Sequence, residues 1–264
     1  MRSKLALKDS KLLAFLAHEY DQPFQGWDFS YISRTGRMVE SPLSWSYGSI
    51  IIQHARDAGS LLDIGTGDGE LLASLLPLAT LTCATESYHP NVALAKETLE
   101  PLGVKVYETR AEGPLPFQDG AFDVVIDRHE SYSSAEVFRI LKPSGCFITQ
   151  QVGSKNDNEI RRLLGAGRFP TNKFDLQSAA RQLSEAGFVL DFLKEEYPSR
   201  RFYDVGALVY YLKAVPWVIP DFTVQKYLGS LTRLNGKTER EGYLEDKNHR
   251  FIIVAQKPEF ARSS

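Results

Sequence analysis

The segment Leu61-Leu62-Asp63-Ile64-Gly65-Thr66-Gly67-Asp68-Gly69-Glu70 carries the clearest structural signal in this sequence. Its first four residues form a short, mostly apolar run, which is typical of a buried strand. Three glycines then alternate with other residues, and the leucines that follow at positions 71, 72, 75 and 76 share one side of a helix. Glycine lets a backbone adopt positive φ angles and pass close to a ligand. The segment therefore predicts a strand, a ligand-binding turn and a helix.

The spacing of the three glycines separates this turn from a dinucleotide-binding turn. The chain has G-x-G-x-G at residues 65–69, whereas NAD- and FAD-binding turns have G-x-G-x-x-G. Glu70 stands where the third glycine of that pattern would be. The sequence therefore argues against NAD or FAD as the ligand.

Outward from this segment, apolar runs of strand length alternate with helical patterns. Further strands are expected over residues 81–85, 104–107, 122–126, 146–152, 188–193 and 251–255. Strands that alternate with helices in this way form a parallel sheet covered by helices on both faces. The sequence thus predicts an α/β fold with a Rossmann-like, doubly wound, seven-stranded and mainly parallel sheet.

The chain divides into zones that differ in amino-acid composition and in secondary-structure pattern. Residues 1–59 are rich in aromatic residues and poor in strand signals, and they are expected to form an aromatic N-terminal cap. Residues 60–264 are expected to form the sheet-containing domain, with a helical insertion at about 203–235 before the last strand. Helices are expected over 204–213 and after Asp221 as N-cap, and the mixed-charge stretch 237–250 is expected to be a solvated loop.

Composition and charge exclude several classes of protein. Hydrophobic residues make up 43% and charged residues 24% of the 264 residues, which is typical of a globular chain. The formal net charge of −2 provides no global field to attract nucleic acid. Cys83 and Cys146 lie in apolar runs and are expected to be reduced core residues, so no metal site is expected. No apolar stretch reaches the length of a membrane span or signal-peptide core, so a soluble, cytoplasmic protein is expected.

Glu86 is the second element of the expected site. It comes directly after the strand predicted over residues 81–85. A carboxylate at the carboxyl edge of a parallel sheet can accept hydrogen bonds from both hydroxyls of a ribose. A ligand that contains a nucleoside is therefore favoured, and the alternative is a surface glutamate at a strand end.

With these residues, the chain resembles the class I S-adenosylmethionine-dependent methyltransferases, in their small-molecule, methyltransferase type 11-like branch. The resemblance is closest over residues 60–152, where four motifs occur in order. They are the glycine turn with Glu86, Ala111-Glu112-Gly113-Pro114-Leu115-Pro116-Phe117, Asp119-Gly120-Ala121-Phe122-Asp123-Val124-Val125, and Arg139-Ile140-Leu141-Lys142-Pro143-Ser144-Gly145.

The resemblance implies S-adenosylmethionine as the cofactor. The glycine turn would pass under its methionine part, Asp63 would orient the turn, and Glu86 would hold the ribose. Arg110 stands where many members of the family have an aspartate that binds the adenine, so this subsite departs from the family pattern. The full set of implied cofactor-binding residues is Asp63, Gly65, Thr66, Gly67, Gly69, Glu86, Ala111, Glu112, Asp127 and Arg128.

The reacting edge is expected in the segment Ile126-Asp127-Arg128-His129-Glu130-Ser131-Tyr132, just beyond a buried strand. Methyl transfer from a sulfonium requires alignment and exclusion of water, and it requires a base only if the acceptor must lose a proton. His129 and Glu130 are the candidate catalytic residues, as a base or as a hydrogen-bonding pair for the substrate, because an imidazole titrates near neutral pH. The competing interpretation is that His129 is an ordinary loop residue.

Aromatic residues outside the central zone are expected to form a lid over the substrate. Their rings would stabilise a sulfonium and exclude water, and the alternative is that they pack in the core. The candidates are Trp27, Trp45, Tyr47, Tyr203 and Tyr211.

The sequence therefore predicts a methyltransferase that acts on a small-molecule acceptor. One alternative is an RNA base methyltransferase, which a basic surface strip including Arg161, Arg162, Arg200 and Arg201 would favour. The other is a non-catalytic S-adenosylmethionine-binding protein, which a pocket filled by its own aromatic side chains would favour.

Overall fold

The computed structural model describes residues 2–25, 27–110, 113–167 and 174–259, with the backbone alone for residues 2–9. The chain forms two compact units built from interleaved segments. The sheet unit comprises residues 43–154, 173–196 and 250–264, and the accessory unit comprises residues 1–42, 155–172 and 197–249. The division at residue 59 into a cap and a methyltransferase domain stays a prediction.

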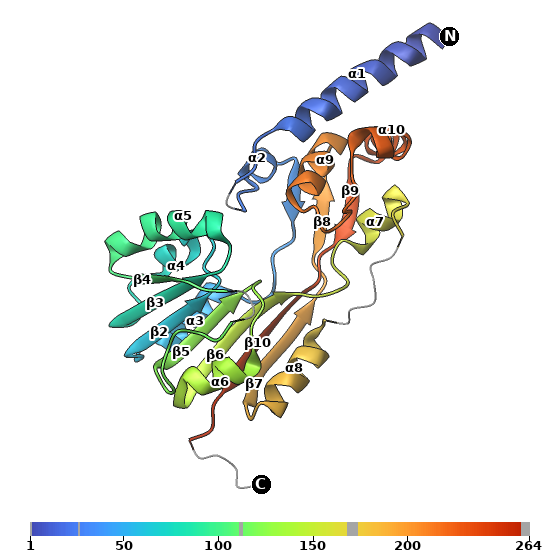
Figure 1. Cartoon of the computed structure of the whole chain (residues 1–264). Coiled ribbons are helices and arrows are strands. Elements are labelled where there is room, and N and C mark those ends of the chain that lie inside the picture. The colour runs from blue at the N-terminus through green and yellow to red at the C-terminus, as the bar shows by residue number, and fades with distance from the viewer. Residues whose placement is uncertain (1, 26, 111–112, 168–173, 260–264) are drawn as a thin grey trace. The chain divides into compact units, whose positions relative to one another are not determined.

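The sheet unit is built on a seven-stranded sheet with the order β4-β3-β2-β5-β6-β10-β7 (Figure 1). Neighbouring strands from β4 to β6 are parallel, and β10 is antiparallel to both β6 and β7. This confirms the predicted mainly parallel, seven-stranded sheet. The strands are β2 (Ser60–Ile64), β3 (Leu81–Glu86), β4 (Lys105–Glu108), β5 (Phe122–Arg128), β6 (Leu141–Val152), β7 (Val189–Glu196) and β10 (Arg250–Gln256).

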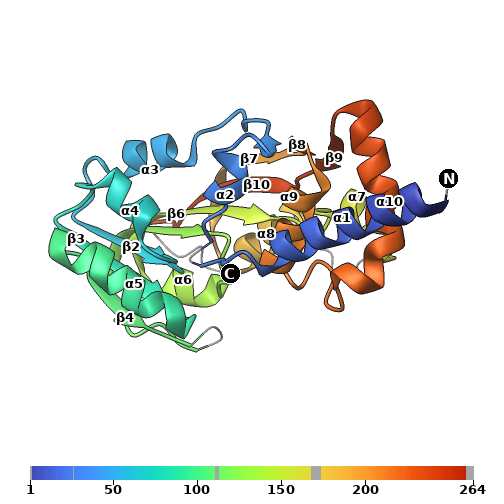
Figure 2. The same cartoon turned by 90° about the horizontal axis from the view of Figure 1, so that it is seen from above.

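Helices cover both faces of this sheet, as Figure 2 shows from above. On one face, α3 (Tyr47–Ala55), α4 (Glu70–Leu75) and α5 (His89–Leu99) bury Ile51, Leu72 and Leu99 against the sheet. On the other face, α6 (Ser134–Ile140) and α8 (Leu176–Glu185) bury Val137 and Leu183. A central strand between two apolar layers has no side that faces water, which explains why all five residues of β2 are buried. The predicted doubly wound arrangement is confirmed.

The accessory unit contains an antiparallel three-stranded sheet of order β1-β8-β9 and a set of helices. Its centre is α9, in which every residue except Lys213 is buried. The Asp204 side chain caps this helix by accepting a hydrogen bond from the Ala207 N–H (2.8 Å). The elements are α1 (Arg2–Asp21), α2 (Ser30–Ser33), β1 (Met38–Glu40), α7 (Asn158–Leu164), β8 (Ser199–Phe202), α9 (Val205–Ala214), α10 (Val224–Glu241) and β9 (Leu244–Lys247).

Two expectations for the end of this unit are wrong. The N-cap of α10 is Thr223, whose side chain accepts from the Lys226 N–H (3.1 Å), so the helix does not begin after Asp221. The stretch 237–250 is not a loop, because α10 continues through Glu241 and β9 follows it. The helix continues because Leu234 and Thr238 keep one face buried.

None of the helices in the described parts of the chain combines the length and the apolar character that crossing a bilayer requires.

Candidate active site

The glycine turn after β2 has a backbone that other residues adopt only with strain. Gly65, Gly67 and Gly69 have φ angles of 66°, 66° and 83°. The turn is held against the neighbouring strand β3 by a hydrogen bond from the Thr66 N–H to the Thr85 carbonyl oxygen (2.9 Å). A Cβ atom built on Gly67 would meet no atom within 4 Å, so this part of the turn borders open space. The turn is therefore a preformed cradle with an open side.

Glu86 braces this cradle from the end of β3. The carboxylate is buried, and it accepts hydrogen bonds from the Gly67 N–H at Oε2 (2.7 Å) and from the Tyr88 N–H at Oε1 (2.7 Å). Burial raises the pKa of Glu86, and these two N–H groups act in the opposite direction. Each carboxylate oxygen still has acceptor capacity, because an oxygen of this kind can accept more than one hydrogen bond.

Asp63 lies at the carboxyl end of β2, on the face of the sheet that α3 covers. Burial raises its pKa to about 7, and the negative charge of Glu86 acts in the same direction. The buried Thr66 hydroxyl interacts with the Asp63 carboxylate and acts in the opposite direction on this pKa. The buried Tyr47 hydroxyl lies near both Asp63 and the backbone of Asp127. The donor and acceptor set thus suits a polar ligand next to the glycine turn.

Asp127 is fully buried where β5 ends. Its Oδ1 accepts from the Thr149 hydroxyl (3.1 Å) and from Gln151 Nε2, and its Oδ2 has no partner among the described residues. Burial raises the pKa of Asp127 well above its usual value, and the neighbouring carboxylates of Asp63 and Glu130 add to this. Burial therefore favours the protonated form of Asp127, in which Oδ2 can donate a hydrogen bond.

Glu130 lies directly against the glycine turn. A Cβ atom on Gly65 would be only 2.4 Å from the Cγ atom of Glu130, so only glycine fits at this position. The Glu130 Oε1 atom accepts from the backbone N–H and the hydroxyl of Ser131 (3.1 and 3.2 Å). Its carboxylate is therefore held at the mouth of the cradle.

His129 has a backbone in the left-handed region, with φ of 67°, and its N–H donates to the Gln150 carbonyl oxygen (2.9 Å). The residue is exposed, and desolvation by neighbouring protein atoms lowers the pKa of the imidazole below its usual value. The guanidinium groups of Arg250 and Arg128 act in the same direction. His129 is therefore neutral at neutral pH.

A cavity of about 460 Å³ adjoins these residues, within the size range of small-molecule sites. The ends of β2 and β3 line it, and Gly65, Arg110, Glu130 and Tyr132 are among its walls. The other lining residues are Thr109, Gly113, Pro114, Leu115, Ser131, Ser133, Glu136 and Val137. The predicted adenine contacts Ala111 and Glu112 lie outside the described residues. Arg110, which replaces the usual aspartate, lines this cavity.

The expected lid residues fall in both units. Trp45 and Tyr47 belong to the sheet unit, where Tyr47 is buried beside Asp63 and Trp45 bonds Gln150. In the accessory unit, Tyr211 is buried and its hydroxyl donates to Asp157 Oδ1 (2.9 Å). The other two candidates, Trp27 and Tyr203, are exposed.

Sequence reasoning missed three polar side chains of β6 at this edge. Thr149, Gln150 and Gln151 are all buried, although a central strand usually carries apolar residues. The consecutive polar residues at the end of the apolar run 146–148 were the available signal.

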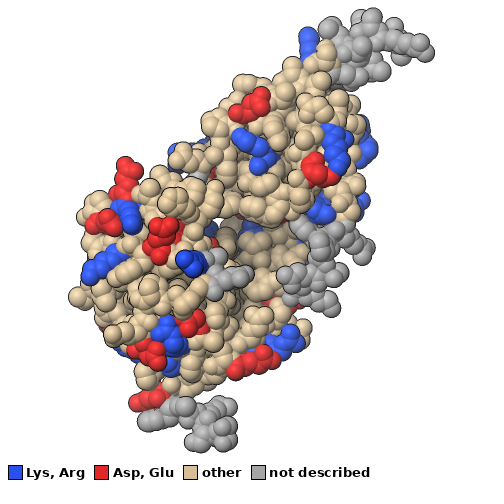
Figure 3. Space-filling view, in the orientation of Figure 1, with Lys and Arg blue, Asp and Glu red and all other residues tan. Residues whose placement is uncertain are grey.

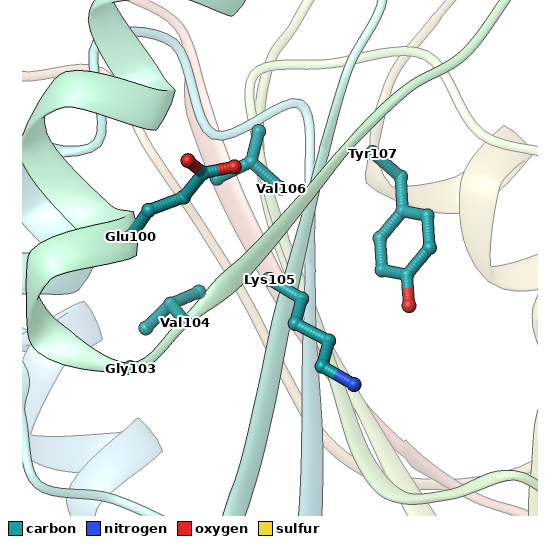
Figure 4. Close-up of a pocket in the computed structure, with 6 residues that line it drawn as sticks. All are labelled: Glu100, Gly103, Val104, Lys105, Val106 and Tyr107. Carbon is teal, nitrogen blue, oxygen red and sulfur yellow. The ribbon is translucent and has the colours of Figure 1, made fainter.

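A second hollow, of about 400 Å³, lies against the edge strand β4 and the turn before it (Figure 4). Glu100, Lys105 and Tyr107 are among its lining residues. It contains none of the predicted site residues, so the candidate site is the cavity beside the glycine turn. The described residues contain no group of three or more His, Cys, Asp or Glu side chains arranged to hold a metal ion.

The four arginines that would form a basic strip do not do so. Arg161 and Arg200 are buried, Arg162 pairs with Glu159, and Arg201 pairs with Glu245. On the face that Figure 3 shows, basic and acidic side chains are interspersed.

Comparisons with known proteins agree with this geometry. Residues 62–149, from β2 to β6, match the family model of a methyltransferase domain. Similar solved structures include the YcgJ protein from Bacillus subtilis, with 16% identity, a TM-score of 0.58 and coverage of 81% of this chain and 99% of that chain. A proposed methyltransferase from Bacillus halodurans has 17% identity, a TM-score of 0.56 and coverage of 80% and 98%. An S-adenosylmethionine-dependent methyltransferase from Aquifex aeolicus has 15% identity, a TM-score of 0.50 and coverage of 87% and 94%.

At these identities the likeness to solved structures is one of fold, and no curated protein matches the sequence. The family match includes the glycine turn and Glu86, and the sheet is the predicted mainly parallel, seven-stranded one. The resemblance to the class I S-adenosylmethionine-dependent methyltransferases is thereby confirmed over residues 62–149, the part of the chain that matches a methyltransferase domain.

Proposed function

We propose that this chain binds S-adenosylmethionine beside the glycine turn and transfers its methyl group to a small-molecule acceptor. The observation that carries the proposal is the preformed cradle: three glycines at positive φ, open space at Gly67, and Glu86 bonded to the Gly67 N–H. A cradle of this kind matches a ligand with a ribose and an extended polar tail.

The proposed cofactor contacts are those that the resemblance implies. Gly65, Thr66, Gly67 and Gly69 would face the methionine part, and Glu86 would accept hydrogen bonds from the ribose hydroxyls. The buried Asp63 and Asp127 and the exposed Arg128 would supply polar contacts, and Ala111 and Glu112 would lie beside the adenine. When bound, the sulfonium supplies an activated methyl group, and the chain itself needs only to orient the acceptor and exclude water.

The proposed substrate contacts are His129 and Glu130, as a base or as a hydrogen-bonding pair. Both lie at the edge of the sheet where β5 ends, and Glu130 borders the cavity. Trp27, Trp45, Tyr47, Tyr203 and Tyr211 are proposed as substrate or lid residues. The small-molecule class is favoured over RNA because the arginines that would form a basic strip are buried or paired.

Calorimetry with three ligands tests the cofactor. S-adenosylmethionine and S-adenosylhomocysteine should bind, and NAD should not, because Glu70 replaces the third glycine of a dinucleotide turn. NAD binding tighter than S-adenosylmethionine would overturn the assignment. Transfer of labelled methyl groups into a metabolite extract and into total RNA then separates the two acceptor classes. Binding without transfer to either would instead support the non-catalytic alternative.

A further inference from the structure

Three side chains from separate segments of the sheet unit form a chain that ends at His129. The Trp45 Nε1–H donates a hydrogen bond to the Gln150 Oε1 (2.8 Å). The Gln150 Nε2 lies 3.4 Å from the Nε2 of His129. Gln150 is buried, so its amide hydrogens depend on partners within the protein. The imidazole ring is therefore linked to the indole through one amide.

The chemistry of the indole determines which way this amide faces. An indole N–H only donates, so the Gln150 atom that faces Trp45 must be the carbonyl oxygen. The amide nitrogen then faces His129, and because an amide NH₂ only donates, the His129 Nε2 must accept. A neutral imidazole whose Nε2 accepts carries its proton on Nδ1. An imidazolium would place one N–H group against another and is disfavoured.

Two arginines lie on the same face of the sheet as Gln150. Arg128 pairs with Gln150 between β5 and β6, and Arg250 pairs with Val152, two residues further along β6. Paired residues share a face, as do residues two apart, so Arg128, Gln150 and Arg250 leave the same face. Arg128 is exposed and forms no ion pair within 4 Å in the part of the chain that the structure describes, although the Asp63 carboxylate is near enough to feel its charge. Arg250 lies opposite Glu196 of β7. Arg128 is therefore the group that can attract an anion to the edge where His129 lies.

We propose that Gln150 and Trp45 hold His129 as the Nδ1–H tautomer, and that Nδ1–H donates a hydrogen bond to an oxyanion on the methyl acceptor. This inference rests on the proposed methyltransferase function and names its acceptor class: a carboxylate or phenolate that is ionised before it binds. An oxyanion that gains a methyl group releases no proton, because its lone pair forms the new O–C bond and the electrons of the broken C–S bond go to sulfur. His129 is then a hydrogen-bond donor to the acceptor, and Gln150 and Trp45 are positioning residues.

The tautomer is tested by ¹⁵N NMR of the full chain labelled at its five histidines, with the His129 signals assigned from a His129→Gln variant. The wild type should show a protonated Nδ1 and an unprotonated Nε2 at neutral pH. Gln150→Glu should move the proton to Nε2, because a carboxylate accepts from both Trp45 and His129. Trp45→Phe should give a mixture of tautomers, because the amide is then free to flip, and Trp217→Phe, an exposed tryptophan of the accessory unit, should change nothing.

A wild-type protein with its proton on Nε2 would overturn the inference, and so would a Gln150→Glu variant that keeps the Nδ1–H form. The wild-type spectrum tests the tautomer even if a variant does not fold. This measurement needs neither cofactor nor transfer. A chain with the expected tautomer that binds no S-adenosylmethionine therefore contradicts the proposed function alone.

The acceptor class is tested with benzoate as the anionic probe and benzylamine as a cationic probe of similar size. Benzoate should shift the His129 Nδ1 signal, and benzylamine should not. Arg128→Gln should weaken the benzoate effect by about threefold to tenfold, as expected for loss of one charge-assisted contact. A benzoate effect no larger than that of benzylamine would overturn the assignment of an oxyanion.

Discussion

Glu86 has two roles. Its carboxylate accepts hydrogen bonds from backbone N–H groups next to the glycine turn, and it is proposed to bind the ribose. Glu86→Ala removes the acceptor of the Gly67 and Tyr88 N–H groups and the proposed ribose contacts. A hydrogen bond to a charged group contributes about 1.5–3 kcal/mol. We therefore expect the dissociation constant for S-adenosylmethionine to rise at least about tenfold in calorimetry, in a protein that still folds.

Glu108→Ala is the matched control for this substitution. Glu108 ends the next strand, β4, directly opposite Glu86 in the sheet register, and its side chain is half exposed beside His89. Its removal should leave cofactor affinity unchanged. Equal affinities of the two variants would show that the ribose does not lie at Glu86.

Asp63 makes the stability of the protein depend on pH. Its pKa is about 7 in the folded protein and about 4 in an unfolded chain, so the folded state holds a proton that the unfolded state releases between these values. Stability from this group is thus present below about pH 4 and is lost as the pH rises to about 7. Asp63→Asn, measured by denaturant unfolding across this range, should become more stable than the wild type as pH rises, with no further gain above about pH 7. A difference in the free energy of unfolding between Asp63→Asn and the wild type that does not vary with pH would contradict the raised pKa of Asp63.

In the glycine turn, the effect of backbone strain on stability can be distinguished from the effect of ligand contact on binding. Gly67→Ala places a methyl group in open space at a φ of 66°, so it should cost about 1–2 kcal/mol of stability and also weaken cofactor binding. Gly103→Ala is the matched control, because Gly103 has a φ of 85° and open space around its Cβ position but lies before β4. Thermal unfolding should show similar losses for both variants. Calorimetry should show weaker binding for Gly67→Ala alone, and equal binding would place the ligand elsewhere.

The elements that the sequence predicted well are those with strong local patterns. The apolar run of β2, the glycine turn and Glu86 lie within 27 residues, so their relation follows from one strand–helix–strand repeat. The link from Trp45 to Gln150 joins residues 105 positions apart, and only the pairing of β5 with β6 brings His129 to it. A contact of this kind has no local signal in the sequence.

The three-stranded sheet of the accessory unit was not predicted for a related reason. Strands β8 and β9 have four residues each, and their inward-facing residues include Arg200 and Asp246. A charged residue at a core position looks like a surface residue in the sequence, so residues 237–250 were expected to be a loop. Burial of these charges is possible only because they pair with each other.

The buried ion network around Arg200 connects separate segments of the accessory unit. Arg200 pairs with Asp157 before α7 and with Asp246 on β9, and it donates to the Tyr211 hydroxyl on α9. Arg200→Ala leaves two buried carboxylates without their partner, which should cost about 3–5 kcal/mol of stability in chemical denaturation. Arg201→Ala, on the same strand but with an exposed side chain, should have little effect. Similar losses for both variants would contradict the structural role of the network.

The methyl donor is proposed to lie across the glycine turn with its ribose at Glu86. The decisive measurement is a crystal structure of the chain with S-adenosylhomocysteine. Both ribose hydroxyls should lie within hydrogen-bond distance of the Glu86 carboxylate, and the amino-acid tail of the ligand should lie against Gly67. A ligand bound elsewhere, or one whose ribose makes no contact with Glu86, would contradict it.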